Sequence, residues 1–261
     1  MTTLAVPRRV PPLGGLNATL LGLELRRLLR NRRTMIITLV MPVVFFLIFG
    51  LNPSYSGESA GNGNVSAYVM ISMALYGAMI ATTSGGAMVS VVSVERASGW
   101  SRQLRLTPLS PGVYIFVKVL VAMMLGLGAV GVVYLVGAFT SVRMDTSLWF
   151  ATALITWLGS AVFAAFGLFM GYLLPSENVM QILGPGLAVL GFAGGLFMPL
   201  QDGSVWASIA QFMPTYGLSQ LVHAPLTGEA MQWTWLLNVA VWLAIFVGGA
   251  AWRFQRDTER V

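Results

Sequence analysis

The sequence predicts an all-α integral membrane protein with six transmembrane helices, an N-terminal amphipathic helix at the membrane interface and an outer re-entrant helical hairpin between helices five and six. Hydrophobic residues make up 56% of the 261 residues and charged residues only 9%, whereas roughly 25% are charged in a soluble domain. Six stretches long enough to cross a bilayer contain no charged residue. Residues 1–261 are therefore expected to form a single transmembrane domain.

The six uncharged stretches cover residues 34–51, 67–93, 119–140, 148–174, 178–198 and 233–252. In hydrocarbon, the backbone polar groups are satisfied only by helices or closed barrels. The stretches lack the alternating pattern of barrel strands, so we expect helices. The first stretch has no A-x-A-like cleavage site within reach, which favours an uncleaved span over a signal peptide.

The basic residues predict the orientation. Of the 15 Lys and Arg residues, seven precede the first span, four lie between spans two and three, and three follow span six. Only Arg143 falls on the opposite side. Cytoplasmic loops carry an excess of Lys and Arg, so both termini are predicted to be cytoplasmic in a multi-pass protein of the cytoplasmic (inner) membrane. This pattern accounts for the net charge of +6 without a nucleic-acid partner.

Residues 16–33 have the pattern of an amphipathic helix. Leucines recur at helical spacing at positions 21, 25, 28 and 29, and arginines at 26, 27, 30 and 33 occupy the opposite side. Such a helix lies along the cytoplasmic membrane surface. The alternative is a basic segment that only sets the topology.

Residues 199–231, on the outer side, contain no Lys or Arg. Trp206, Ile209, Ala210 and Met213 share one helical face, and the apolar pattern restarts after Pro214. We interpret the segment as two short helices that dip into the outer leaflet and are separated at Pro214.

Several kinds of chemistry are disfavoured. No Cys is present, so disulfides and zinc-thiolate sites are excluded. The predicted spans contain no Asp, Glu, Lys, Arg or His, which disfavours ion-coupled transport. Lys118, the only lysine, follows no glycine-rich phosphate loop, and His223 has no second histidine to share a metal. We expect no catalytic residue, metal or cofactor in this chain, and no enzyme activity of its own.

The second cytoplasmic loop carries the most specific signal. Its residues 95–111 read E-R-A-S-G-W-S-R-Q-L-R-L-T-P-L-S-P. This segment resembles the E-R-x-x-G-x-x-x-x-L-x-x-T-P-L-S segment of type 2 ATP-binding cassette exporter permeases, in the daunorubicin-resistance-like branch. The resemblance extends to the basic amphipathic helix, the six spans, the outer hairpin and the short basic tail. Trp100 departs from the small or hydroxyl residue that is common in the family.

The residues of this loop also suit a short cytoplasmic helix. Gly99 permits a sharp turn, and Pro108 ends a helix over residues 100–106 because the residue before proline disfavours helix. The resemblance implies that this is the coupling helix, which docks in a groove of a separate ATPase, with the helix at 16–33 beside it. An ordinary positive-inside loop would explain the arginines alone. The candidate coupling residues are Glu95, Arg96, Gly99, Trp100, Arg102, Leu104, Arg105, Thr107 and Pro108, and those of the interfacial helix are Glu24, Arg26, Arg27 and Arg30.

Spans one, two and five would line the interface of two permease halves in such a family. Flexible Met and aromatic side chains repack around dissimilar apolar ligands. The alternative is that these residues face lipid or neighbouring helices. The candidate substrate path comprises Phe45, Phe46, Phe49, Met73, Tyr76, Met79, Asn178, Gln181 and Phe192.

The expected function is therefore a permease subunit that moves hydrophobic or amphiphilic compounds (drug, antibiotic or lipid-like) out across the cytoplasmic membrane. The expected partners are two copies of a separate ATPase that binds ATP and magnesium, a second permease half (identical or paralogous), the substrate and membrane lipid. Three alternatives remain open: a polysaccharide or glycolipid exporter, a non-transporting membrane assembly factor, and a membrane-embedded enzyme that lacks evident catalytic groups.

Overall fold

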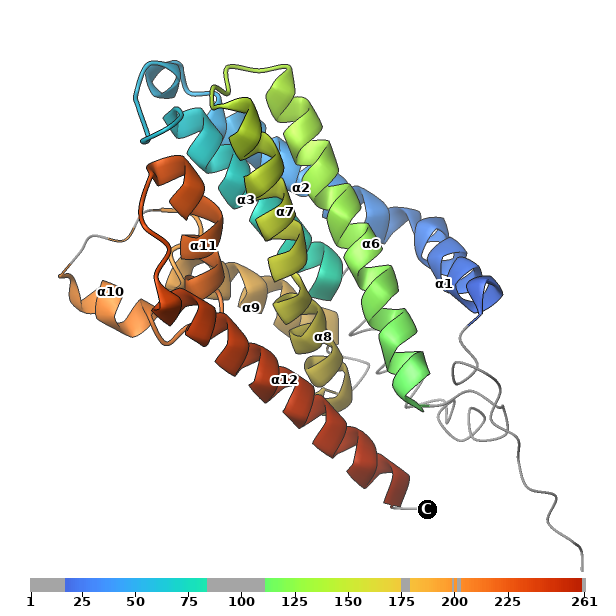
Figure 1. The fold of residues 1–261 in the computed structure, drawn as a ribbon. Coiled ribbons are helices and arrows are strands. Elements are labelled where there is room, and N and C mark those ends of the chain that lie inside the picture. The colour runs from blue at the N-terminus through green and yellow to red at the C-terminus, as the bar shows by residue number, and fades with distance from the viewer. Residues whose placement is uncertain (1–16, 84–110, 175–178, 199, 201–202, 260–261) are drawn as a thin grey trace, which may run out of the picture.

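The computed structural model describes residues 17–83, 111–174, 179–198, 200 and 203–259. Within these ranges every regular element is a helix, apart from two isolated β-bridges, Ser59 with Asn64 and Gly63 with Met144. Figure 1 shows the long helices side by side, with α1 (Ala18–Arg30) and α10 (Val205–Ala210) towards the edges. The predicted all-α class is confirmed.

Six further helices form the bundle: α2 (Arg32–Gly50), α3 (Val65–Thr83), α6 (Pro111–Ala138), α7 (Thr146–Gly159), α8 (Ala161–Leu173) and α12 (Trp233–Glu259). In Figure 1, the loops 51–64 and 139–145 lie at one end, and α6 begins and α12 ends at the other. We call these the outer and inner ends, after the predicted topology. Successive long segments of the chain run alternately from one end to the other, as the predicted topology requires.

Helix α3 is the centre of the bundle. It packs against α2, α6, α7, α8, α9 and α11. Its side chains are buried on every face, and Ala67, Met70, Ile71, Ala74 and Leu75 are inaccessible to solvent. A helix that is apolar all round requires such an enclosed position.

The number of spans differs from the prediction. Four helical segments of the described chain are long and apolar enough to cross a membrane, with α7 and α8 counted as one. The α1 and α2 pair gives a fifth if it is a single bent span. The predicted fifth span corresponds to α9 (Val179–Ala193), which has 15 residues and is shorter than the roughly 20 needed for a typical bilayer. The count of six stays a prediction.

The helix that contains the predicted third span starts earlier than the uncharged stretch, which begins at residue 119. Helix α6 begins at Pro111, and Lys118 lies inside the apolar segment Ile115–Ala138. The charge is tolerated because the Lys118 side chain is enclosed by protein and paired with a carboxylate of α1. A pattern based on uncharged runs cannot anticipate such a partner.

A helix is present in the predicted amphipathic segment. Asn17 caps α1, and its side chain accepts a hydrogen bond from the Thr19 backbone N–H at 2.9 Å. The axis changes direction by 63° between α1 and α2. Leu21 and Leu28 pack against the protein core, whereas Leu29 is 51% exposed. The position of α1 at the membrane surface stays a prediction.

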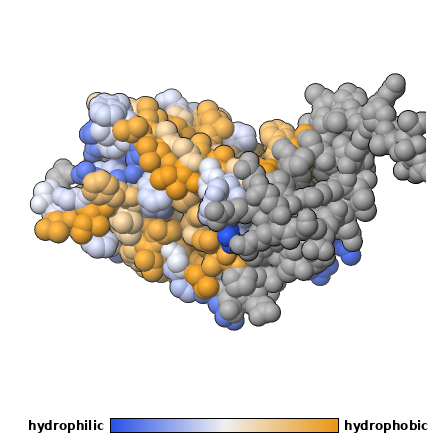
Figure 2. Space-filling view, turned by 90° about the horizontal axis from the view of Figure 1, so that it is seen from below, coloured by the Kyte–Doolittle hydropathy of each residue, from blue (hydrophilic) through white to orange (hydrophobic). Residues whose placement is uncertain are grey.

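The outer segment contains two short helices, α10 and α11 (Tyr216–Thr227), on either side of Pro214. Helix α11 is packed inside the molecule, whereas α10 turns Val205, Trp206 and Ile209 outward. Whether the pair re-enters the membrane stays a prediction. Large apolar patches lie among polar ones on the coloured part of the surface in Figure 2, and many large hydrophobic side chains of the described residues are exposed, which suits a protein surrounded by lipid.

Candidate functional site

An ion pair joins the N-terminal helix to the bundle at the inner end. Glu24 lies four residues before the buried Leu28 on α1, so both face α6. Lys118 lies seven residues into α6, about 10 Å along that helix. The Lys118 Nζ donates a hydrogen bond to the Glu24 Oε2 over 3.0 Å. Apolar residues of both helices, including Leu20, Val117 and Val121, pack together in one hydrophobic cluster.

The ion pair fixes the position of α1. Lys118 is 1% exposed and Glu24 is 19% exposed, and a charge so deeply buried is tolerated only when it is paired. Helix α6 follows directly after the predicted coupling loop. The ion pair therefore connects α1 to the helix that follows the predicted coupling loop.

The other predicted contacts with the ATPase are only partly described. Arg26, Arg27 and Arg30 are exposed on α1, on the side away from Leu28. The coupling residues Glu95, Arg96, Gly99, Trp100, Arg102, Leu104, Arg105, Thr107 and Pro108 lie outside the described residues.

A row of aromatic rings joins α2, α3 and α9. Phe49 lies 6.1 Å from Phe45, and Phe45 stacks on Tyr76 of α3 at 6.3 Å between ring centroids. Tyr76 meets the edge of Phe197 at 5.0 Å, and Phe197 lies 4.6 Å from Phe192 of α9. All four separations fall in the range of favourable ring contacts. Phe49 and Phe192, at the two ends, are 57% and 59% exposed.

The structure divides the predicted substrate path into two groups. Phe45, Phe49, Tyr76 and Phe192 belong to the aromatic row, together with Phe197, which the sequence reasoning missed. Phe46, Met73 and Met79 are instead buried in the core. Gln181 is exposed on α9, and Asn178 lies outside the described residues.

The first outer loop holds the outer end together through the motif Gly61-Asn62-Gly63-Asn64. Gly61 has a positive φ of 73°, and an added Cβ would lie 2.6 Å from the Leu226 carbonyl oxygen. Only glycine allows this close approach to α11. Asn62 reinforces it, because its backbone N–H donates to the Leu226 carbonyl at 2.7 Å and its amide to the Pro225 carbonyl at 3.1 Å.

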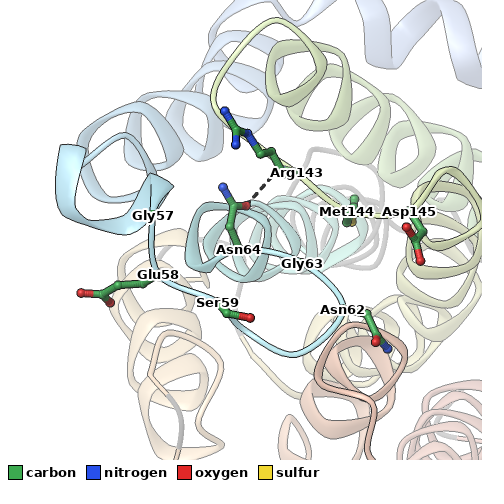
Figure 3. Close-up of a pocket in the computed structure, with 9 residues that line it drawn as sticks. All are labelled: Gly57, Glu58, Ser59, Asn62, Gly63, Asn64, Arg143, Met144 and Asp145. Carbon is green, nitrogen blue, oxygen red and sulfur yellow. Dashed lines mark hydrogen bonds between the residues drawn. The ribbon is translucent and has the colours of Figure 1, made fainter.

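Asn64 joins the same loop to the 141–143 segment. Its Oδ1 caps α3 by accepting from the Ala67 N–H at 3.1 Å, and it also accepts from the Arg143 N–H at 3.0 Å (Figure 3). Its Nδ2 donates to the Ser141 carbonyl at 2.7 Å. A single side chain thus satisfies three backbone groups, and the predicted outer Arg143 lies beside it. The alternation of Gly and Asn was the available signal in the sequence.

Helix α11 is bonded to α9 as well as to the first loop. The Thr215 hydroxyl donates to the Leu190 carbonyl at 2.7 Å, and the Ser219 hydroxyl donates to the Gly195 carbonyl at 3.2 Å. On its other side Gly217 allows α12 to approach, because an added Cβ would lie 2.6 Å from the Trp235 carbonyl oxygen.

A cavity of about 830 Å³ lies between the first outer loop, α3, α11 and the start of α12. The aromatic residues in its lining are Tyr55, Tyr68, Phe197, Tyr216 and Trp235, and the polar ones are Ser59, Gln220, His223, Thr227, Glu229 and Gln232. Phe197 belongs to both the cavity wall and the aromatic row. We refer to this space as the outer cavity.

His223 is buried in the wall of the outer cavity. Its Nδ1 faces the Ser219 carbonyl at 2.7 Å, so this nitrogen carries a proton, because a carbonyl only accepts. Its Nε2 lies 3.0 Å from the Ser72 hydroxyl, and its ring stacks on Tyr68 at 3.9 Å. Burial lowers the pKa of His223 to about 4, so the ring is neutral at pH 7. Among the described residues, no group of three or more His, Asp and Glu side chains could hold a metal ion.

Comparisons with known proteins agree with this arrangement. Residues 16–224 match the family described as ABC-2 type transporter. The chain is also 25% identical over 230 residues to "Putative transport permease YvfS" of Bacillus subtilis (strain 168), an alignment that covers 86% of this chain and 91% of that protein. The match includes α1 and the helices of the aromatic row, and the multi-helical apolar structure agrees with it. The chain is therefore a permease subunit that belongs to the ABC-2 type transporter family.

Proposed function

We propose that this permease exports hydrophobic or amphiphilic compounds across the cytoplasmic membrane, with both termini on the cytoplasmic side. Two permease halves pair with two copies of a separate ATPase, which binds ATP and magnesium. The ATPase docks on the coupling loop at 95–111 and on the exposed arginines of α1. The outer helices α10 and α11 re-enter the outer leaflet.

The observation that carries the substrate class is the aromatic row. It runs from an exposed ring on α2, through Tyr76, to an exposed ring on α9, and its only polar atom is the Tyr76 hydroxyl. Its exposed end rings, Phe49 and Phe192, offer contact area to an apolar molecule but few hydrogen bonds to a sugar chain, whereas Tyr76 between them is buried. A polysaccharide exporter is expected to present more polar groups along this path.

The ion pair between Glu24 and Lys118 supports the proposed transfer of motion. Movement of the coupling loop acts directly on α6, and α1 follows because it is held to α6. The two proposed ATPase contacts therefore move as a unit.

The test is transport in proteoliposomes that contain the permease and its ATPase. We expect ATP-dependent accumulation of a hydrophobic fluorescent dye, and a several-fold lower rate in Tyr76→Ala and Phe197→Ala. Phe139→Ala is the matched control, because Phe139 is 85% exposed and lies outside the row. Equal rates in all three variants would exclude the aromatic row as a path.

Coupling has its own test. Leu104→Asp is expected to abolish binding of the ATPase, or the stimulation of its hydrolysis by substrate, because a charge replaces an apolar anchor. Unchanged complex formation and unchanged stimulation would contradict the proposed role of the loop.

A further inference from the structure

The outer cavity has the size and composition of a small-molecule site. Its volume of about 830 Å³ lies within the roughly 300–1,000 Å³ typical of ligand pockets. It is formed by segments far apart in the sequence, from Tyr55 in the first loop to Trp235 at the start of α12. The hydrogen bonds from Asn62 to the end of α11 fix one wall of this space.

The charges of the lining favour a cation. Glu229 is exposed and acidic, and it forms no ion pair with a described residue. The described lining contains no Lys or Arg. His223 adds no positive charge, because its Nδ1–H is bonded to the Ser219 carbonyl and its ring is neutral at pH 7. The described lining therefore carries one formal negative charge and no positive charge.

The aromatic residues add a second preference for a cation with an apolar body. Five aromatic side chains contribute to the wall, and the faces of aromatic rings attract cations. The side chains of Tyr55, Tyr216 and Gln220 form no hydrogen bond with any described residue, so their polar atoms are open to a ligand or to water. Neither preference suits an anionic lipid headgroup.

We propose that the outer cavity binds a lipophilic cation, with its positive charge near Glu229 and its apolar body against the aromatic wall. Phe197 connects this site with the aromatic row, so a ligand that leaves the row can enter the cavity at the outer end. The inference depends on the proposed export only for the direction of movement. Binding itself can be measured without transport.

The test is equilibrium binding of radiolabelled tetraphenylphosphonium to the permease and its ATPase in neutral phosphatidylcholine nanodiscs, with empty nanodiscs as the background. We expect saturable binding, a dissociation constant raised about fivefold to tenfold in Glu229→Gln, and a similar loss in Tyr55→Ala. Glu58→Gln is the matched control, because Glu58 is also an exposed acid of the outer end but lines a different depression (Figure 3). It should bind as the wild type does.

Tetraphenylborate separates charge from shape, since it is an anion of nearly the same form. It should compete for the site at least tenfold more weakly than unlabelled tetraphenylphosphonium. Equal competition by the two ions, unchanged affinity in Glu229→Gln, or the absence of saturable binding would overturn the proposal. Saturable binding without ATP-dependent transport in proteoliposomes would instead contradict the export function and leave the cation site intact.

Discussion

Replacement of Glu24 by Gln should destabilise the protein more than replacement of Lys118 by Met. Glu24→Gln keeps an oxygen that can accept a hydrogen bond but removes the negative charge that faces an ammonium group only 1% exposed. Lys118→Met removes the buried charge itself and retains an apolar side chain of similar length. The carboxylate left behind is 19% exposed and can reach water.

The geometry sets the magnitudes. Two charges 3.0 Å apart attract by about 5 kcal/mol at an effective dielectric constant of ~20, and much of this is offset by desolvation. Loss of one partner of a buried pair costs about 3–5 kcal/mol. We assign this cost to Glu24→Gln and about 1 kcal/mol to Lys118→Met. At roughly 2–4 °C per kcal/mol, the midpoint should fall by about 10 °C in the first variant and by a few degrees in the second.

The assay is the loss of the monodisperse gel-filtration peak after heating in detergent. Arg26→Gln serves as the control for a charge change on the exposed side of α1 and should leave the midpoint unchanged. The double variant should be more stable than Glu24→Gln alone, because no buried ammonium group remains. If Lys118→Met is as damaging as Glu24→Gln, or if the two effects simply add, the ion pair does not hold α1 as described.

Three further predictions concern the outer end. Asn64→Ala should lower the free energy of unfolding by about 2 kcal/mol, since it removes a helix cap and the hydrogen bonds to residues 141 and 143. Proteolytic cleavage of the 139–145 loop should become faster in this variant. An unchanged cleavage rate would argue against the role of Asn64. Acidification from pH 7 to 5 should lower the thermal midpoint of the wild type more than that of His223→Gln. The folded pKa of His223 is about 4 and the unfolded pKa about 6.5, so stability present above pH 6.5 is lost as the pH falls towards 4. Tyr68, Ser72 and Ser219 are the polar residues that contact this ring, and parallel pH profiles would contradict the assignment. Gly217→Ala should separate α11 from α12 and lower the midpoint in the same heating assay, whereas Gly22→Ala, which meets open space, should not.

The sequence predicted those elements whose signal is local. The leucines of α1, the break at Pro214 and the position of Arg143 in an outer loop follow from spacing and residue type, and the structure contains a helix, a break and a loop at these places. The side of α1 that faces the bundle contains Glu24 instead of Leu29, which is exposed. Glu24 can lie on that side because it pairs with Lys118, 94 residues away, and helical periodicity carries no information about such a partner.

In the candidate site too, residues with a local signal were predicted, and residues whose role depends on distant contacts were not. Phe45, Tyr76 and Phe192 were selected by residue type on three predicted spans, and the structure brings them into one row. Met73 and Met79 were selected on the same grounds, and, like Tyr76, they are buried in the core because α3 is enclosed on all sides, but they have no aromatic ring that could join the row. Phe197 and the motif at 61–64 were missed because their roles arise from contacts between segments far apart in the chain.

Helix α11 is bonded to other segments at both of its ends. Near Tyr216 it is tied to the end of α9, and near Thr227 it is tied to the first outer loop. Its 12 residues form a strut of about 18 Å between these two points. A tilt of α9 would therefore displace a loop that precedes it by more than a hundred residues, and would change the shape of the outer cavity in the same movement.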